Sequence, residues 1–372
     1  MKRLLFLLVA ALVAAPSLSL AQVKIGVINS MTGPQAPIGE NLTNGIKLAE
    51  EDLAAKGIKV QLVWEDDTGK PQVGLSAMDK LATRDNVAGV VGAYTSAVTN
   101  AVAKKAEQYK VPLVNPVASK EEITRQGYKY VFRVSATTGD YASILLDMAT
   151  TLGKPKSIAI LSENTDFGVS GAKSAKAYAE KKGIQVVFEE AYSPGSPDYR
   201  STLVKVKGSN PDLMFMVSYV ADAITLMRQS RELQLTPMAF LGAGAGFSTA
   251  EFASEKNISN AVFSSTQWTP DVSWPGAKAF GERYQKRFGK VPSYHAANAY
   301  TAMLILGETA AGLRAGSWDG LFGPVKFQDF DGYVNQNKHQ MLVEQVQNGQ
   351  YFTVWPPAQQ SAKPIWPFPG WK

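Results

Sequence analysis

Two serines follow strand-like segments, and the first of them could bind an anion. Ser96 comes after the β-rich run that ends at Tyr94, and we expect a helix to begin near Ala97. A helix N-terminus offers free backbone N–H groups and the positive end of the helix dipole, so it favours a group such as a carboxylate. Ser119 closes the segment NPVAS after another strand-like run. N-capping is the alternative role, and from the residues alone it is the commoner one for serine.

The residue types that catalysis needs are scarce. The chain has no cysteine and two histidines, His295 and His339, which excludes disulfides, thiolate metal sites and a histidine-rich metal cluster. Asp166-Phe167-Gly168 spells a kinase triplet, but the accompanying kinase motifs are missing. A serine hydrolase needs a base held against its serine, and neither histidine lies in such a motif. We therefore predict no catalysis, no cofactor and no metal site.

The composition is that of an ordinary globular protein. The 372 residues are 45% hydrophobic and 19% charged, which argues against disorder, and the length suggests two domains. The formal net charge is +6, without a run of basic residues. We therefore expect no nucleic-acid partner.

The N-terminus has the pattern of a secretory signal peptide. Lys2 and Arg3 give a positive start, Leu4 to Ala15 form an apolar stretch of 12 residues, and a Ser-Leu-Ala triplet ending at Ala21 marks a cleavage site. A retained membrane-spanning helix is the alternative, but spanning takes about 20 apolar residues. We predict a cleavable signal peptide over residues 1–21 and an exported protein, periplasmic or extracytoplasmic.

Strand-like and helix-like patterns alternate along the rest of the chain. Residues 41–56 place Leu42, Ile46, Ala49 and Leu53 on one helical face. Strand-like runs are predicted at Val23–Ile28, Ile58–Trp64, Val87–Tyr94, Pro112–Asn115, Ile158–Ser162, Ile184–Glu190 and Leu213–Val217. Such alternation predicts mostly parallel sheets flanked by helices.

The two halves of the chain echo each other. Gly57 and Gly183 lie in similar segments and are 126 residues apart, and Pro112 and Pro237 lie in another similar pair and are 125 residues apart. Coincidence is the alternative, because short β-rich runs look alike. The nearly equal offsets favour two lobes with one βαβ plan and a ligand cleft between them, beyond the carboxyl ends of the strands. Residues 355–372 are rich in Pro and Trp, and we expect an extended strap across a lobe, with a disordered end as the alternative.

These segments together resemble one family throughout nearly the whole chain. The sequence is similar to the periplasmic branched-chain amino-acid-binding proteins, the type I solute receptors of ATP-binding-cassette transporters. The resemblance is carried by KIGVINSMTGPQAPIGENLTNGIKLAEEDLAAKG, WEDDTGKPQVG, VVGAYTSAVTNAVAKKAEQYKVPLVNPVAS, SIAILSENTDFGVSGAK, SPGSPDYRSTLVKVKGSNPDLMFMVSYVADAITLMRQSRELQL and FGPVKFQ in this order. It implies two lobes that close on a solute and then dock on a permease.

The resemblance implies roles for residues of the first lobe. Ser96 matches the serine that holds the ligand α-carboxylate, and Ser119 matches a hydroxyl residue that binds the amino acid. Val117 lies where the family offers main-chain groups to the ligand, and Ile38 lies where the family contacts the ligand side chain.

Aromatic residues are implied for the other wall. Phe167 and Tyr219 match two aromatic positions of the second lobe, although without the family both would be assigned to the core. Tyr294 or His295 is expected to line the apolar end of the same site.

One departure bears on the ligand. The family has a glutamate that pairs with the ligand ammonium, and this sequence has Gly244 there. A buried ammonium without an anionic partner is costly. Either another acid serves, with Asp222 the nearest candidate, or the ligand has no α-ammonium.

The sequence thus predicts an α/β fold of two Rossmann-like lobes with parallel-rich sheets flanked by helices and joined by a hinge, as in type I periplasmic binding proteins. We place lobe 1 at residues 22–138 plus 267–328 and lobe 2 at 139–266 plus 329–372. The expected function is that of a monomeric receptor that binds a small amino acid, branched or apolar, and delivers it to a membrane permease. Alternatives are an amide, a urea-like molecule, an aromatic or aliphatic carboxylate, a chemosensory role, or an exported α/β hydrolase.

Overall fold

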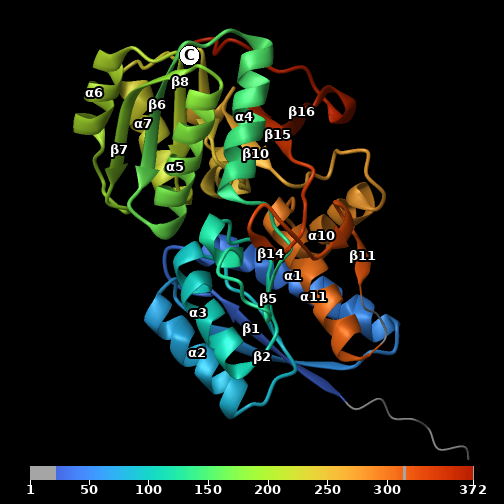
Figure 1. Ribbon diagram of the computed structural model, residues 1–372. Helices are drawn as coiled ribbons and strands as arrows, with labels where there is room; N and C mark the ends of the chain where they lie inside the picture. Colours follow the sequence, from blue (N-terminus) through green and yellow to red (C-terminus); the bar gives the residue numbers. More distant parts are fainter. Residues whose placement is uncertain (1–21, 313–315, 372) are drawn as a thin grey trace, which may run out of the picture.

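Two lobes, each built around a seven-stranded sheet, make up the protein in a computed structural model that describes residues 22–312 and 316–371 (Figure 1). The expected signal peptide, residues 1–21, lies outside the described residues. Within the described part, no helix is long and apolar enough to cross a membrane.

Lobe 1 begins with the N-terminal third of the chain. Its elements are β1 (Val23–Asn29), α1 (Ala36–Ala55), β2 (Val60–Asp66), α2 (Pro71–Thr83), β3 (Val90–Val91), α3 (Ser96–Tyr109), β4 (Leu113–Asn115), the 3₁₀ turn η1 (Glu121–Thr124) and β5 (Val131–Arg133). The chain later returns to add α10 (Ala277–Phe288), α11 (Tyr294–Ala310), β11 (Ser317–Gly320), β12 (Gly323–Lys326), β13 (Gln328–Phe330) and β14 (Tyr333–Gln336).

Lobe 2 takes the middle of the chain and its C-terminal end. Its elements are α4 (Thr138–Leu152), β6 (Ser157–Glu163), α5 (Asp166–Lys181), β7 (Gln185–Tyr192), α6 (Arg200–Ser209), β8 (Leu213–Val217), α7 (Val220–Glu232), β9 (Ala239–Gly242), η2 (Ala245–Ser248), α8 (Ala250–Ser254), α9 (Lys256–Ser259), β10 (Phe263–Thr266), β15 (Leu342–Gln347), β16 (Gln350–Trp355) and η3 (Pro357–Gln359).

The two sheets share one strand order, as the internal echo predicted. Five neighbouring strands run β5-β4-β3-β1-β2 in lobe 1 and β10-β9-β8-β6-β7 in lobe 2, and they pair in parallel. Gly57 and Gly183, which follow α1 and α5 closely, have φ angles of +79° and +73°. Glycine adopts this left-handed conformation without steric cost, and it ends a helix before the next strand.

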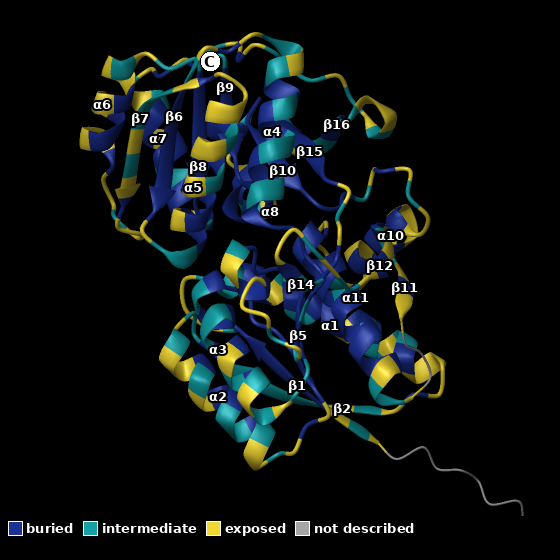
Figure 2. Ribbon diagram, viewed as in Figure 1, coloured by how far each residue is buried: buried dark blue, intermediate teal, exposed yellow. Residues whose placement is uncertain are grey.

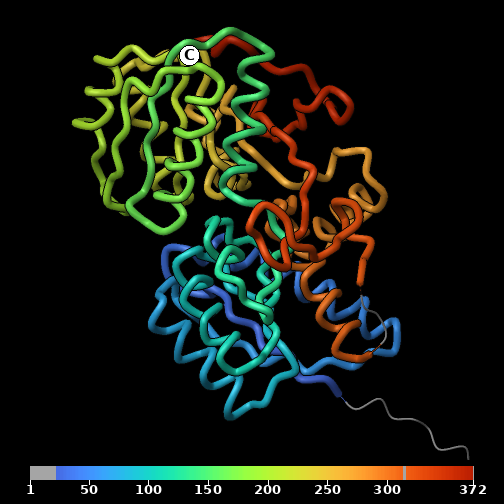
Figure 3. Tube along the Cα trace, viewed as in Figure 1, coloured from blue at the N-terminus to red at the C-terminus, as the bar shows by residue number. Residues whose placement is uncertain are grey.

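The chain crosses between the lobes three times, around residues 134–137, 267–271 and 337–341 (Figure 3). The third crossing comes later than the expected boundary at 328/329, because β13 and β14 complete the sheet of lobe 1. Gln336 on β14 lies beside Arg133 on β5, and its buried side chain accepts hydrogen bonds from Arg133 Nε and Thr124 Oγ1. This buried polar network fixes residues 329–336 in lobe 1 rather than lobe 2.

The helices turn apolar faces to the sheets, and exposed residues gather on the outer faces (Figure 2). The four residues predicted for one face of α1 are all buried. This helix starts at Ala36, five residues before the predicted start. Pro37 fits the first turn, because a backbone N–H there would have no partner within the helix and its absence costs nothing. The strand predicted at Val87–Tyr94 shrinks to Val90–Val91, which lies between Gly89 and Gly92.

The C-terminal residues form the expected strap, and it lies on lobe 2. The backbone N–H of Phe368 donates to Met238 O at 2.7 Å, and Trp371 Nε1 donates to Leu235 O at 2.6 Å. The ring of Phe368 packs edge-on against Phe240, with 5.0 Å between the centroids.

Candidate functional site

A small cavity lies between the lobes, where the carboxyl ends of the central strands of both sheets meet. It is lined by Tyr94, Ser96, Val117, Ala118, Ser119, Tyr141, Phe167, Tyr219, Ala245, Tyr294 and His295. Its volume is about 10 Å³, which is room for about one water molecule. The lobes are therefore closed on each other, and a solute can enter only when they separate.

Ser96 occupies the first position of α3, but it is not the capping residue. Thr95 takes that role, and its hydroxyl accepts a hydrogen bond from Val98 N at 3.3 Å. The Ser96 hydroxyl accepts from Lys120 N at 3.3 Å, and its backbone N–H lies near the phenol group of Tyr219. The start of α3 thus directs its polar groups toward the cleft.

Val117 and Ser119 lie on the loop after β4, which the side chain of Asn115 holds in place. Asn115 Oδ1 accepts from the N–H groups of Val117 and Ala118 at 3.1 and 2.8 Å, and its Nδ2 donates to Ala118 O at 2.8 Å. The Val117 N–H is therefore already bonded. The Ser119 hydroxyl interacts with the hydroxyl of Tyr141, so these two polar groups lie together at the cavity wall.

Aromatic rings form most of the remaining wall. Tyr219 contacts Phe167 of its own lobe at 5.4 Å between centroids, and Tyr94 of the other lobe at 5.6 Å. His295 contacts Tyr94 at 5.8 Å and stacks on Tyr294 at 3.9 Å. Burial raises the pKa of Tyr94 and Tyr219 well above the ordinary value, so both phenols are neutral.

Gly244 lies behind this wall, and two tyrosines fill the space beside it. A Cβ atom on Gly244 would lie 3.2 Å from the Tyr294 hydroxyl and 3.4 Å from Cε2 of Tyr141. Tyr141 accepts a hydrogen bond from Gln267 Nε2 at 2.7 Å, and Tyr294 accepts one from Ala245 N at 3.1 Å. Neutral phenol groups therefore stand where the resemblance implied an acid.

Asp222, the expected replacement acid, is not among the residues that line the cavity. Its carboxylate accepts from Gly195 N at 3.0 and 3.1 Å and from the Tyr199 hydroxyl at 2.8 Å. Glu163 lies closer to the wall and accepts from Tyr219 N. Desolvation raises the pKa of Glu163 to about 8, and Asp222 adds to the shift, so the Glu163 carboxyl is mostly protonated at neutral pH.

Ile38 is also absent from the cavity lining. It is fully buried near the start of α1 and packs in the apolar core of lobe 1. His295 lines the cavity, and its Nδ1 is 3.0 Å from Ser293 Oγ. Burial lowers the pKa of His295 to about 3, so this ring is neutral too. The eleven lining residues therefore include no side chain that is charged at neutral pH.

Two aromatic residues of the wall, Tyr94 and Tyr141, were not predicted from the sequence. Tyr94 stands 125 residues before Tyr219 and follows the equivalent strand, so the internal echo was a signal that could have indicated it. Tyr141 is the second residue missed, and it reaches the cavity from α4. Nothing in its local sequence distinguishes it from a core aromatic.

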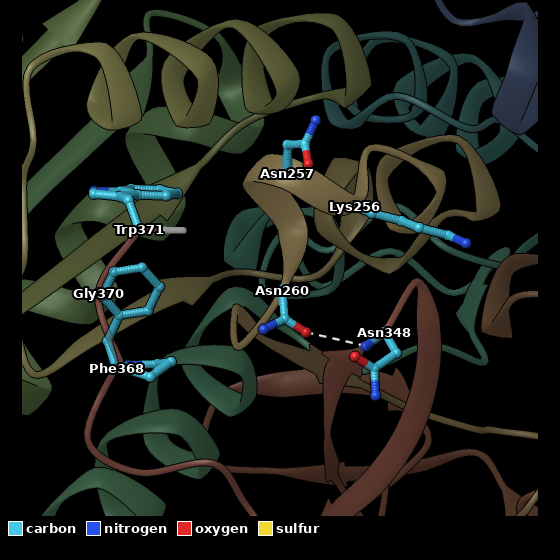
Figure 4. A pocket seen from close by; sticks show the side chains of 8 residues that line it. Lys256, Asn257, Asn260, Asn348, Phe368, Gly370 and Trp371 are labelled. Carbon is cyan, nitrogen blue, oxygen red and sulfur yellow. Dashed lines mark hydrogen bonds between the residues drawn. The ribbon is translucent and has the colours of Figure 1, made fainter.

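A depression elsewhere lies on lobe 2 alone. It measures about 350 Å³ and is bordered by Lys256, Asn257, Asn260, Asn348 and residues 368–371 of the strap (Figure 4). Asn260 Oδ1 accepts a hydrogen bond from Asn348 N at 3.0 Å, and this contact closes one end of the depression. Because one lobe forms it entirely, lobe closure would not change it. Within the described part of the chain, no group of three acidic or histidine side chains is arranged to hold a metal.

Known proteins share this architecture. Residues 22–350 match the model of the periplasmic binding protein family. The Leu/Ile/Val-binding protein homolog 7 of Brucella suis is 28% identical over 388 residues, which covers 96% of this chain and 97% of that protein.

Solved structures give the same picture. The branched-chain amino acid transporter substrate-binding protein LivJ of Streptococcus pneumoniae, in complex with isoleucine, has a TM-score of 0.80 at 23% identity and covers 89% of this chain and 97% of that one. A solute-binding protein of an ABC transporter from Rhodopseudomonas palustris, in complex with 3,4-dihydroxybenzoic acid, has a TM-score of 0.79 at 22% identity and covers 94% and 98%. The two-lobed fold is thus that of type I periplasmic binding proteins, and the chain belongs to the periplasmic binding protein family.

Proposed function

We propose that the protein is the exported, non-catalytic and monomeric substrate-binding protein of an ABC transporter, and that its ligand is a small aromatic carboxylate without an α-ammonium group. One observation carries the choice of ligand. The cavity between the lobes is lined by aromatic rings and neutral polar groups, with Tyr141 and Tyr294 in the space beside Gly244.

The start of α3 suits the carboxylate. The Ser96 N–H and hydroxyl stand at the positive end of the helix, and the phenol oxygen of Tyr219 lies near the N–H in the closed form. When the lobes open, Tyr219 of lobe 2 moves away from Ser96 of lobe 1. A carboxylate then replaces the phenol oxygen and accepts stronger, charge-assisted hydrogen bonds.

The rings suit an aromatic body. Phe167, Tyr219, Tyr94 and His295 already contact one another with centroid separations of 5.4 to 5.8 Å, which is the ordinary range for tilted aromatic pairs. A flat ring between them keeps this type of contact. Ser119 and the Tyr141 hydroxyl at the other end offer neutral hydrogen-bonding partners to a ring substituent.

A branched-chain amino acid is the second candidate, because the relatives are named Leu/Ile/Val-binding proteins and LivJ holds isoleucine. Its ammonium would enter a wall without a charged partner, which is costly. Glu163 is the nearest carboxyl, but it is mostly protonated at neutral pH and bonded to Tyr219 N.

Closure is supported by contacts that join the lobes at the cleft rim. Lys120 Nζ of lobe 1 lies 2.8 Å from Asp166 Oδ2 of lobe 2, and Glu121 N donates to Ser170 Oγ at 3.3 Å. A ligand that adds contacts to both lobes shifts the equilibrium further toward the closed form. We propose that this closed form docks on a membrane permease.

The test is thermal unfolding of residues 22–372 after the protein is stripped of ligand by unfolding and refolding. The panel is benzoate, 4-hydroxybenzoate, leucine and isoleucine, with benzamide as the uncharged control of the same shape. A binder at 100 times its dissociation constant stabilises the fold by about 2.7 kcal/mol. We expect a shift with the benzoates and none with benzamide. A shift with leucine or isoleucine alone would overturn the ammonium-free assignment.

A further inference from the structure

A second cavity lies behind the segment that crosses between the lobes at residues 267–271. It measures about 390 Å³, far more than the cavity in the cleft. Both lobes contribute to it, through Gln285, Val291, Pro292 and Ser293 of lobe 1, Trp268, Thr269, Pro270 and Asp271 of the crossing segment, and Ser248, Ala250, Ala253, Glu344, Gly349, Gln350 and Tyr351 of lobe 2.

The carboxyl group of Glu344 is the unusual feature of this cavity. Glu344 lies on β15 between β10 and β16, and it is only 5% exposed. The Ser248 hydroxyl interacts with this carboxyl group, but Oε1 has no hydrogen-bond partner among the described residues. A buried acceptor without a donor costs free energy, and a donor supplied by a ligand would remove that cost.

The charged groups that line the cavity are acidic, while the side chain of Lys256 lies against Gly349 and is not part of the lining. Asp271 also lines the cavity, but its carboxylate already accepts from Thr353 N at 3.0 Å and from Thr353 Oγ1 at 2.7 Å. The Tyr351 hydroxyl donates to Phe247 O at 2.6 Å, and Glu251 acts on Tyr351 electrostatically. The lining residues include neither lysine nor arginine, so the cavity favours a positive ligand.

Apolar groups surround the same space. Val291, Pro292, Ala250 and Ala253 contribute carbon surface, and Trp268 is fully buried with its ring packed edge-on against Phe280. A cation near such surface needs an organic part that matches it. An alkyl chain with an ammonium head satisfies both halves of the cavity, whereas a metal ion does not.

We propose that this hinge cavity binds a small organic ammonium ion, whose N–H groups donate to Glu344 Oε1 and whose carbon part packs against Ala250, Val291 and Pro292. The site is separate from the cleft and does not depend on the ligand proposed for the cleft. The ammonium and the Glu344 carboxylate then form a buried, hydrogen-bonded ion pair, with Ser248 on the same carboxyl group.

Binding carries a proton signature. Burial raises the pKa of Glu344 to about 8, and Asp271 adds to the shift, so the free protein holds a proton there at pH 7. Pairing with an ammonium favours the charged carboxylate. The carboxyl proton therefore passes to the buffer as the ammonium binds.

The experiment is calorimetric titration of residues 22–372 with n-butylammonium chloride at pH 7, in two buffers that differ in ionisation enthalpy. We expect one ion per chain and release of close to one proton. Glu344→Gln is expected to weaken binding by about tenfold or more and to remove the proton release. The matched control is Glu308→Gln, because Glu308 is a buried glutamate of lobe 1 that pairs with Lys56. This variant should bind n-butylammonium as the natural chain does.

A second variant guards against misfolding of the first. Ala250→Leu at the exposed start of α8 narrows the cavity and leaves Glu344 in place; it should weaken n-butylammonium without loss of thermal stability. n-Butanol should bind about tenfold more weakly or worse, because it lacks the charge. The proposal is overturned if the natural chain does not bind n-butylammonium, or if a folded Glu344→Gln binds it equally well.

Discussion

The two lobes share a strand order, yet they present different chemistry to the cleft. In lobe 1, Thr95 caps α3 with its side chain, and Ser96 is left to face the cleft. In lobe 2, Tyr219 stands at the same place before α7, and its side chain makes no capping bond. One edge therefore offers hydrogen-bond donors, and the other offers a ring.

This difference shows how a repeated plan can make an asymmetric site. The strand order fixes where the two edges meet, but the residue that follows each central strand decides what the edge does. Tyr94 and Tyr219 follow the equivalent strands β3 and β8 and contact each other across the cleft at 5.6 Å between centroids. A solute between the lobes is thus bound by unlike partners, which fixes its orientation.

Gly246→Ala should have the largest effect and should act on the lobe 2 edge. A Cβ atom there would lie 2.4 Å from the carbonyl carbon of Tyr219, which is backbone and cannot rotate away. We expect a loss of about 3 kcal/mol of stability, measured by denaturant unfolding. Gly208→Ala on α6 is the control, because nothing lies within 4 Å of its Cβ position. Equal stability of the two variants would show that the Tyr219 edge is not rigid.

Ser96→Ala tests the lobe 1 edge. If Ser96 holds a carboxylate, loss of its hydroxyl should weaken benzoate by about tenfold to a hundredfold, since hydrogen bonds to charged groups contribute about 1.5–3 kcal/mol. Calorimetric titration measures the change. Ser254→Ala on α8 is the control, because its exposed hydroxyl bonds only within its own helix. Unchanged affinity of Ser96→Ala would move the carboxylate away from α3.

Glu163→Gln tests the pair of carboxyl groups, Glu163 and Asp222, that lies behind Tyr219 in lobe 2. The raised pKa of Glu163 means that the folded state keeps a proton that the unfolded state has released, so stability falls as pH rises toward 8. We expect the variant to flatten the fall between about pH 6.5 and 8 by roughly 1 kcal/mol per pH unit. The pKa of Glu344 is also raised to about 8, so the variant should still lose part of its stability as the pH rises.

Urea unfolding at a series of pH values measures this slope. The two buried histidines, whose pKa values are lowered to about 3, add an opposite slope near pH 6.5 because they gain protons only on unfolding. That contribution is the same in the natural chain and in Glu163→Gln, so it cancels when the two slopes are compared. Glu190→Gln is the control, since hydrogen bonds from Thr202 and Lys205 lower the pKa of Glu190 and place its titration well below the window. An unchanged slope in Glu163→Gln would show that Glu163 is ionised in the folded state.

Thr95→Ala should have the smallest effect and should separate capping from binding. Loss of the bond from Val98 N costs about 1 kcal/mol of stability, measured by thermal unfolding. Thr95→Ser keeps the hydroxyl and should keep most of the stability. We expect the benzoate affinity of both variants to stay within about twofold. A large loss of affinity in Thr95→Ala alone would assign the anion to Thr95 rather than to Ser96.

The sequence by itself determined the features that depend on local pattern. The apolar spacing along α1 gave its buried face, glycines ended helices where a left-handed residue was required, and equal offsets gave two lobes of one plan. The position of Ser96 at the start of α3 also follows from a strand and a helix that are adjacent in the chain. These features need only neighbouring residues and their period.

Tertiary structure alone decided which side chains share the cavity. Tyr141, Gly244 and Tyr294 are far apart in the chain and meet only because α4, the loop after β9 and α11 converge there. Asp222 has the right charge for an ammonium, but Gly195 and Tyr199 hold its carboxylate elsewhere. Contacts between distant segments depend on how whole elements pack, and local residue preferences carry no information about that packing.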